Sequence, residues 1–411
     1  MNIIIFTENK SAGGMDTFYE NLVKAWPNKD DKIIFICNKG HPGLKFLSNV
    51  FPDNSRIVPH SLLLSWDINW VNNIQIIIIQ KIIRKLLKYA LLPYQYLSIK
   101  NLLKTINADF LISVNGSYPG GITTRLANIA WKSIGKGKSV HSLHGLSLHN
   151  DSSYGFKKSL NIFDKYITVK HISSLSNLVC VSQSCADSLK NYPGYDDRLP
   201  AQVIYNGINL EEENKSESTL NLRNNLKLSK DSKILLMLGT YDSNKGHAHL
   251  FKAMNIVLNK YPECHLVICG DHRGLEKYLV VKSMENIMSD TKNIHLLDYI
   301  PNASSLIKQV DILLIASQIT EAFGLTAIEA MKYKKPIIST EIDGLRETVG
   351  LDGDAGYCLE KNNYASYADK IIYLLKNPDI RNDMGENGRK RIESKFNSVR
   401  MSEEYYALLL K

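Results

Sequence analysis

Several features that mark particular protein classes are scarce or missing in this chain of 411 residues. There are only six cysteines, and none of them forms a Cys-x-x-Cys pair, so the sequence predicts neither a disulfide framework nor a zinc knuckle. The sparse cysteines indicate a reducing compartment, and we expect a cytoplasmic protein. No Gly-x-Gly-x-x-Gly motif occurs, and Gly135-Lys136-Gly137-Lys138-Ser139 lacks the first glycine of a P-loop. The dehydrogenases and nucleotide hydrolases that depend on those motifs therefore lose support.

Charge-free apolar stretches of membrane-spanning length are missing as well. The richest apolar stretch runs from Ile68 to Leu92 and contains four basic residues: Lys81, Arg84, Lys85 and Lys88. A spanning helix needs roughly 18 or more apolar residues with few charges. We therefore expect no transmembrane segment.

What the chain does contain is the composition of a globular protein. Hydrophobic residues make up 44% and charged residues 22%, which excludes a collagen-like or disordered chain, and the length predicts two domains of about 200 residues each. The net charge of +9 lies in the first half: residues 1–205 carry 23 basic and 13 acidic side chains, against 27 and 28 in residues 206–411. This asymmetry favours an anionic partner for the first half, such as a membrane surface, a phosphorylated substrate or nucleic acid.

Short apolar runs alternate with helix-length segments along the whole chain, which is typical of buried parallel strands in an α/β protein. In the first half the expected strands are Asn2–Thr7, Lys32–Cys37, Asp109–Val114, Ser139–Leu143, Leu178–Ser182 and Gln202–Tyr205. In the second half they are Lys233–Leu238, His265–Cys269, Ile294–Leu297, Ile312–Ala316, Pro336–Thr340 and Gly356–Leu359. We therefore predict two doubly wound, Rossmann-like domains that face each other across a ligand cleft at the carboxyl ends of their strands.

The boundary between the two domains is expected at a polar stretch. Residues Glu211–Thr219 show no apolar periodicity, which places a linker near residues 207–230. We predict one domain over residues 1–207, a second over residues 208–390, and a C-terminal helix over residues 391–411 that crosses back to the first domain.

The segment from Asp311 to Met331 is typical of a strand, a loop and a helix. A helix that begins near Gly324 would direct free N–H groups and its positive dipole end into the cleft, which suits a diphosphate. Glu321 precedes this helix and Glu329 lies one to two turns into it, so two carboxylates flank the phosphate position and can accept hydrogen bonds from sugar hydroxyls. A helix-start acid and an unrelated surface acid explain the spacing equally well.

The spacing Glu321-x7-Glu329, with Phe323-Gly324-Leu325 between the glutamates, resembles the Glu-x7-Glu signature of the retaining glycosyltransferases of family 4, which have the GT-B fold. Further pieces follow in the family's order: Gly13-Gly14, His144-Gly145, Val203–Gly207, Gly239, Lys245-Gly246, Gly270-Asp271 and Asp343-Gly344. The resemblance covers nearly the whole chain and is weakest over residues 40–110. It implies an acceptor-binding first domain and a nucleotide-sugar-binding second domain.

Three residues take catalytic roles by this resemblance. It implies that Lys245 neutralises the leaving nucleoside diphosphate, a role that suits a cation beside a developing phosphate charge. Glu321 is implied to hold hydroxyls of the donor sugar, and His144 to face that sugar near its anomeric carbon. Taken singly, Lys245 is equally typical of a surface turn, and His144 of a structural histidine.

The remaining matches are implied to bind the donor. Glu329 would bind the ribose hydroxyls, the backbone of Phe323, Gly324 and Leu325 would add contacts, and the Gly13-Gly14 loop would let the backbone approach phosphates and acceptor. The family commonly has Arg directly after the glycine that matches Gly239, whereas this chain has Thr240. Phosphate neutralisation would then rest on Lys245, the helix end, or another basic residue such as Arg273.

The implied reaction moves a sugar from a nucleotide-sugar to an acceptor hydroxyl with retention at the anomeric carbon, usually drawn as a front-face attack. No cofactor is expected, and no metal is assigned, because Asp352-Gly353-Asp354 is more typical of a solvated turn. Two alternatives stay open: a GT-B-fold epimerase that acts on a nucleotide-sugar, and an inactive sugar-binding scaffold subunit, for which Thr240 is the only support.

Residues 74–92 predict a basic amphipathic helix. Such a helix can lie in an anionic membrane interface, or it can face the core with a solvated basic side. With the charge asymmetry, the first alternative favours a peripheral enzyme at the inner face of the plasma membrane that extends a lipid-linked glycan, as in bacterial O-antigen or capsule assembly. No nucleic-acid partner is expected.

Overall fold

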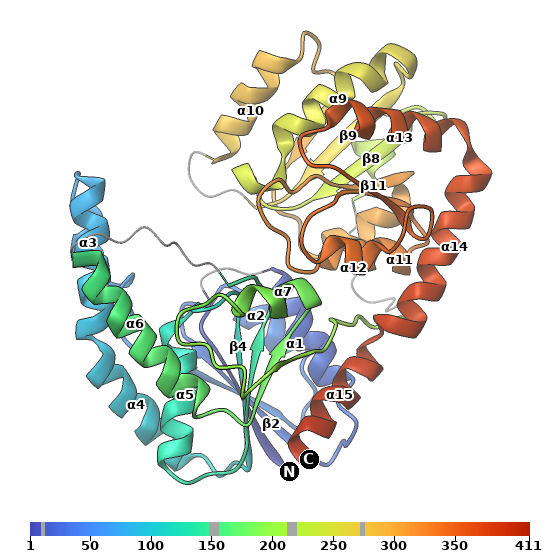
Figure 1. The fold of residues 1–411 in the computed structure, drawn as a ribbon. Helices are drawn as coiled ribbons and strands as arrows, with labels where there is room; N and C mark the ends of the chain where they lie inside the picture. Colours follow the sequence, from blue (N-terminus) through green and yellow to red (C-terminus); the bar gives the residue numbers. More distant parts are fainter. Residues whose placement is uncertain (10–12, 148–155, 212–219, 272–275) are drawn as a thin grey trace. The chain divides into compact units, whose positions relative to one another are not determined.

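The computed structural model describes residues 1–9, 13–147, 156–211, 220–271 and 276–411. The chain divides into two compact units (Figure 1). Unit 1 comprises Met1–Ile204 and Ser402–Lys411, and unit 2 comprises Tyr205–Met401. Residues 212–219 of the expected linker lie outside the described residues.

Unit 1 is built on a parallel sheet. Among the described residues it has seven strands in the order β3-β2-β1-β4-β5-β6-β7. The strands are β1 (Asn2–Thr7), β2 (Lys32–Asn38), β3 (Ser55–His60), β4 (Phe110–Asn115), β5 (Ser139–Leu143), β6 (Asn177–Cys180) and β7 (Ala201–Val203). The strand β3 was missing from the prediction. It is an edge strand that pairs only with β2 among the described strands, and Arg56 and Pro59 break its apolar pattern.

Helices cover both faces of this sheet (Figure 1). They are α1 (Gly14–Lys24), α2 (Leu44–Val50), α3 (Ile77–Ala90), α4 (Leu92–Thr105), α5 (Ile122–Ser133), α6 (Phe156–Ile172) and α7 (Gln183–Leu189), with a 3-10 turn at Asn69–Asn73. Because side chains alternate along a strand, Ile4 and Phe6 of β1 point to one face. There they pack with Leu103 of α4 and Leu126 and Trp131 of α5.

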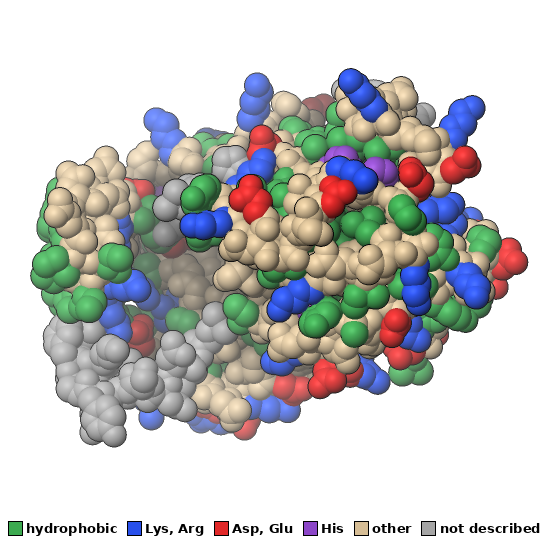
Figure 2. Space-filling view, turned by 90° about the horizontal axis from the view of Figure 1, so that it is seen from above, with side chains coloured by type: hydrophobic (Ala, Val, Ile, Leu, Met, Phe, Trp, Pro, Cys, Tyr) green, Lys and Arg blue, Asp and Glu red, His purple; other side chains and the backbone are tan. Residues whose placement is uncertain are grey.

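Helix α3 differs from its neighbours because it has no buried residue. Its large apolar side chains are exposed, among them Ile77 at 63% and Ile78 at 71%. Hydrophobic side chains gather at the left edge of Figure 2, where α3 and α6 lie in this view. The alternative of a core-facing apolar side is therefore wrong for this helix. No helix among the described residues is long and apolar enough to cross a membrane.

Unit 2 repeats the architecture with, in its described part, six parallel strands in the order β10-β9-β8-β11-β12-β13. The strands are β8 (Lys233–Leu238), β9 (Cys264–Cys269), β10 (Ile294–Leu297), β11 (Ile312–Ile315), β12 (Ile337–Thr340) and β13 (Gly356–Leu359). The helices are α8 (Leu222–Asn225), α9 (His247–Lys260), α10 (Glu276–Ile287), α11 (Leu325–Lys332), α12 (Leu345–Val349), α13 (Tyr364–Lys376) and α14 (Pro378–Lys395). The last helix, α15 (Ser398–Leu410), begins in unit 2 and continues into unit 1. The two parallel sheets confirm the predicted pair of doubly wound α/β domains.

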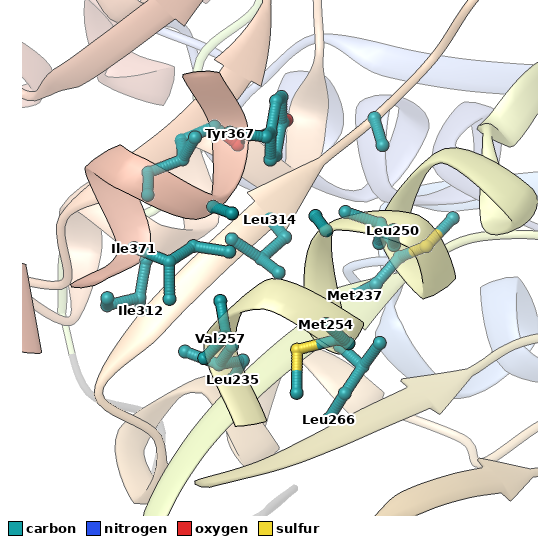
Figure 3. Close-up of a cluster of buried hydrophobic side chains, with 14 of the residues drawn as sticks. Leu235, Met237, Leu250, Met254, Val257, Leu266, Ile312, Leu314, Tyr367 and Ile371 are labelled. Atoms are coloured by element: carbon teal, nitrogen blue, oxygen red, sulfur yellow. Dashed lines mark hydrogen bonds between the residues drawn. The ribbon is translucent and has the colours of Figure 1, made fainter. Parts of the chain in front are cut away.

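The core of unit 2 lies between α9, α13 and the central strands (Figure 3). Leu250, Met254 and Val257 of α9 share this cluster with Leu235 and Met237 of β8. On the α13 side, the Tyr367 hydroxyl donates to the carbonyls of Ile315 (2.6 Å) and Ile338 (2.8 Å). This fully buried tyrosine thereby ties the carboxyl end of β11 to the neighbouring strand β12, next to the loop that carries the candidate site.

Candidate active site

The loop between β11 and α11 is the centre of the candidate site in unit 2. Helix α11 begins at Leu325, and its N-cap, Gly324, has a φ of 85°. That left-handed conformation favours glycine, and a Cβ atom there would also collide with Leu345. Phe323 is buried, and the Thr348 hydroxyl donates to its carbonyl at 2.6 Å. The three residues predicted to surround a donor phosphate, Phe323, Gly324 and Leu325, thus form a fixed helix start.

Lys245 and Glu321 meet across this loop. The Lys245 ammonium lies 2.7 Å from Glu321 Oε2, and both side chains are partly exposed. The Ser317 hydroxyl donates to the same carboxylate oxygen at 3.1 Å. Lys245 ends a short 3-10 turn (Ser243–Lys245) after β8 and is followed by Gly246, which has a φ of 74° and approaches the Ala316 carbonyl too closely for any Cβ atom. The two residues predicted as catalytic are therefore 76 positions apart in sequence and in direct contact.

Asn244, which the sequence did not single out, holds these two loops together. Its side-chain oxygen accepts from the N–H groups of Ile319 (3.0 Å) and Thr320 (2.9 Å), and its amide nitrogen donates to the Thr320 carbonyl at 2.9 Å. Its own backbone carbonyl accepts from Gln318 N–H at 2.7 Å. On the other side, the Glu321 N–H donates to Asp343 Oδ2 at 2.9 Å. The position of Glu321 is thus set by side chains on both sides of its loop.

Glu329 lies on α11, in the turn that follows the helix start. Burial raises the pKa of this carboxyl to about 7, because the charged form loses hydration that no partner replaces. Hydrogen-bond donors that approach this carboxyl would favour its ionised form, which is the better hydrogen-bond acceptor. The two hydroxyls of a ribose would supply such donors.

Thr240 follows β8 and donates its hydroxyl to the Asp242 carboxylate. It thus lies on the same β8 loop as Lys245 but carries no charge toward a phosphate. Arg273, the substitute considered above, lies outside the described residues. No group of three or more His, Cys, Asp or Glu side chains among the described residues is placed to hold a metal ion.

The other predicted residues lie in unit 1. His144 follows β5, where Ser142 Oγ lies 3.1 Å from its Nε2 and the Phe18 ring lies 4.1 Å away between centroids. Burial lowers the pKa of His144 to about 3, so the imidazole is neutral. A neutral histidine can donate or accept a hydrogen bond toward a sugar hydroxyl but adds no charge.

Gly13 and Gly14 line a pocket in unit 1. Its volume is about 450 Å³, and it is lined by Glu8, Asn9, Gly13, Gly14, Met15, Trp66, Asn115, Gly116, Ser117, Gly120 and Gly121. These residues come mainly from the carboxyl ends of β1 and β4 and from the starts of α1 and α5. Gly13 has a φ of 152°, and its N–H donates to Asp16 Oδ2 at 3.0 Å. The pocket has the position expected of a ligand site in a doubly wound domain.

Two protein-family models match the chain and together cover both units. The model for Glycosyltransferase Family 4 matches residues 12–212, and the model for glycosyl transferases group 1 matches residues 218–391. The matches indicate a GT-B glycosyltransferase of the GT4 type. The Lys245–Glu321 pair lies within the group 1 match, and Gly13 and Gly14 of the unit 1 pocket lie within the family 4 match.

Individual relatives of this chain are glycosyltransferases as well. It is 28% identical to an uncharacterized glycosyltransferase of Methanocaldococcus jannaschii over 62% of this chain and 64% of that protein. It is 27% identical to the capsular polysaccharide biosynthesis glycosyltransferase CapM of Staphylococcus aureus over 48% of this chain and 51% of CapM. The match thus spans between about half and two thirds of these relatives. Among solved structures, Anabaena HepE in complex with UDP superimposes with a TM-score of 0.73 at 15% identity, covering all of both chains, which shows the shared fold.

Proposed function

We propose that this protein transfers a sugar from a nucleotide-sugar to an acceptor hydroxyl, with retention of the anomeric configuration. The observation that carries the proposal is the Lys245–Glu321 ion pair at the start of α11. A lysine beside a helix N-terminus provides two sources of positive potential for a leaving diphosphate. A carboxylate held by that lysine is free to turn to sugar hydroxyls once the diphosphate replaces it as the partner of the ammonium group.

Each remaining residue has a defined part in this proposal. Glu329 accepts hydrogen bonds from the ribose hydroxyls, the backbone of Phe323–Leu325 contacts the phosphates, and the Gly13-Gly14 loop borders the space for the acceptor. His144 lies beside the donor sugar as a neutral hydrogen-bonding group. The protein then acts mainly by orienting substrates and stabilising charge, while the leaving phosphate oxygen takes the acceptor proton. HepE, which has the same fold, was solved with UDP, and this supports a uridine nucleotide as the first donor to test.

For the acceptor, we propose a lipid-linked glycan of a surface polysaccharide, elongated at an anionic membrane surface. CapM supports the polysaccharide part because it is a capsule-biosynthesis glycosyltransferase. The exposed apolar side chains of α3 and the excess of basic residues in the first half support the membrane part.

The test is transfer by the purified chain from UDP-sugars, with the anomeric configuration of the product read by NMR. We expect a product with the donor's configuration, and Lys245→Ala abolishes most of the transfer. Lys292→Ala, which removes an exposed lysine of the same unit, keeps the wild-type rate. An inverted product would contradict retention. Release of an epimerised sugar nucleotide would identify the epimerase alternative, and binding without turnover the inactive scaffold.

A further inference from the structure

A buried polar cluster in unit 1 takes no part in the function proposed above. Arg125 of α5 is fully buried, and none of its three guanidinium nitrogens has a hydrogen-bond partner among the described residues. Its guanidinium carbon lies 5.9 Å from the centre of the Tyr118 ring. A guanidinium carries a permanent charge and five N–H donors. Burying it without an acceptor is strongly unfavourable, so Arg125 lacks a hydrogen-bonded acceptor within the described part of the chain.

Among the aromatic neighbours of Arg125, the Tyr118 hydroxyl interacts with the guanidinium but does not reach hydrogen-bond geometry, and none of these neighbours carries a negative charge. The rings of His141 and His171 pack 4.6 Å apart, and the Tyr118 hydroxyl lies 3.2 Å from His171 Nδ1. Burial lowers the pKa of both histidines, that of His141 to about 3, and raises the pKa of Tyr118. All three side chains are therefore neutral at physiological pH.

The nearby carboxylate of Asp164 does not supply this acceptor either. One of its oxygens accepts the Tyr89 hydroxyl, whereas the other is buried and has no partner among the described residues. No hydrogen bond joins Asp164 to Arg125. The Thr168 hydroxyl of the same helix, α6, is also buried, and it interacts with the hydroxyls of Tyr118 and Tyr192 without reaching hydrogen-bond geometry.

A second cation faces the same region from another helix. Lys88 of α3 forms no ion pair or hydrogen bond within the described part of the chain. Burial and repulsion by Arg125 lower its pKa, while Asp164 and Glu8 act in the opposite direction. Glu8 also lines the 450 Å³ pocket of unit 1. The two cations therefore lie close enough to interact with each other, and Lys88 also interacts with a carboxylate that lines the pocket.

We propose that Arg125, Lys88 and Thr168 bind a phosphate group of the acceptor at the edge of the unit 1 pocket. A tetrahedral dianion matches two cations and a hydroxyl, and the planar guanidinium can bind two of its oxygens at once. Helix α3 contributes Lys88 to this site, and its Tyr89 hydroxyl donates to Asp164 of the cluster. The phosphate site itself follows from unit 1 alone, and only the identity of its bearer as the acceptor rests on the proposed function.

The test is thermal unfolding of the full chain in rising concentrations of inorganic phosphate at constant ionic strength. All variants are made in a Lys245→Ala background, which weakens phosphate binding at the proposed donor site. We expect phosphate to raise the melting temperature of this parent. Arg125→Gln lowers the phosphate affinity by about tenfold or more and Lys88→Gln by less, whereas Lys132→Gln, an exposed lysine of α5, leaves it unchanged. An unresponsive parent, or an equal response in Arg125→Gln, would overturn the proposal.

Asp164→Asn gives a second test that does not depend on the folding of an Arg125 variant. The proposal predicts tighter phosphate binding, because a competing carboxylate is removed. Unchanged or weaker binding combined with lower stability would mean that Asp164 is the real partner of Arg125, and it would sink the proposal. A larger rise in melting temperature with farnesyl diphosphate than with glucose 6-phosphate assigns the phosphate to a lipid-linked acceptor. A larger rise with glucose 6-phosphate assigns it to a soluble phosphosugar. UDP binding, measured separately on the wild type and Lys245→Ala, tests the donor function without involving Arg125.

Discussion

The loop that carries Glu321 and the cluster around Arg125 differ in how their charged side chains are paired. Both place a charged side chain beside polar groups at one end of a parallel sheet. In unit 2, Glu321 has Lys245 and Ser317 as partners, and Asn244 fixes its loop. In unit 1, Arg125 has no hydrogen-bonding partner among the described residues.

The difference separates two kinds of binding surface. Where the protein completes its own ion pair, a ligand must compete with an existing partner, so the free site is ordered in advance and affinity is moderated. Where a buried charge is left unpaired, it destabilises the free protein. A ligand that pairs with the charge removes this cost, so binding strongly raises the free energy of unfolding. The predictions below test the first half of this contrast in three ways and the exposed helix α3 of unit 1 in one.

The largest effect is expected at the Lys245–Glu321 pair. Lys245→Ala should lower kcat by about 10²- to 10³-fold, because the leaving charge loses its main cation. Glu321→Gln should have an effect of similar size, and the double variant should add at most about a further tenfold, because the two groups act as one unit. Steady-state kinetics with the true donor checks this. Fully additive losses would show that the two residues act separately.

A smaller effect is expected at Asn244. Asn244→Ala removes three side-chain hydrogen bonds to the loop at Ile319 and Thr320, so kcat/KM should fall about tenfold and stability by about 1–2 kcal/mol. The matched control is Asn255→Ala, which removes a hydrogen bond to the Ile287 carbonyl in the same unit and should cost stability alone. If both variants lose activity equally, Asn244 has no special role in positioning Glu321.

Glu329 should make the stability of the protein depend on pH. Its folded-state pKa is raised to about 7 from 4.5, so the native state binds more protons than the unfolded state, and stability falls as pH rises through that interval. Glu329→Gln should flatten this dependence and be more stable than wild type above pH 7, by about 1 kcal/mol because the carboxyl is partly exposed. Urea unfolding at pH 5 and pH 8 measures it. Parallel curves for the two proteins would contradict the raised pKa.

The smallest effect, a few-fold change in vesicle binding, concerns α3. Ile77→Gln with Ile78→Gln should reduce sedimentation with vesicles that contain acidic lipid, because these side chains are exposed and apolar. Lys81→Gln should have a weaker effect that salt abolishes, because exposed charges are screened within about 10 Å at 0.1 M salt. Leu279→Gln, an exposed apolar residue of α10, is the control. If the wild type stays free of vesicles at low salt, the membrane part of the proposal is wrong.

The sequence predicted the central strands well because they are short, apolar and buried on both faces, as at Lys233–Leu238 and Ser139–Leu143. It missed β3, whose place at the sheet edge tolerates Arg56 and Pro59. It identified an amphipathic helix near residues 74–92. It could not say which side faces outward, because the spacing of apolar residues does not show which side of a helix is buried. In the structure Arg84 turns back to the Ser65 carbonyl at 3.2 Å, whereas the isoleucines are exposed.

The candidate site divides in the same way. The sequence indicated Lys245 and Glu321 because resemblance to a family ties residue types to positions, and the structure brings them into contact; their roles remain predictions. It did not indicate Asn244, whose side chain forms hydrogen bonds to backbone groups about 75 positions away. Such partners cannot be recognised from the sequence, because backbone N–H and C=O groups do not depend on the residue type. Arg125 looked like one more basic residue of the first half, since burial depends on the tertiary fold.

The course of helix α15 determines where the chain can be divided into its two units. Its first residues belong to unit 2, whereas Ser402 onward belongs to unit 1, where the Ser402 hydroxyl donates to the Leu22 carbonyl at 3.0 Å. Tyr405 lies 2.5 Å from Ser142, the residue that also contacts His144. A fragment that stops at residue 204 therefore omits part of its own domain, and removal of residues 402–411 should perturb His144, which lies more than 250 positions earlier in the sequence. Chimaeras that exchange the two units should keep residues 402–411 with unit 1 rather than with unit 2.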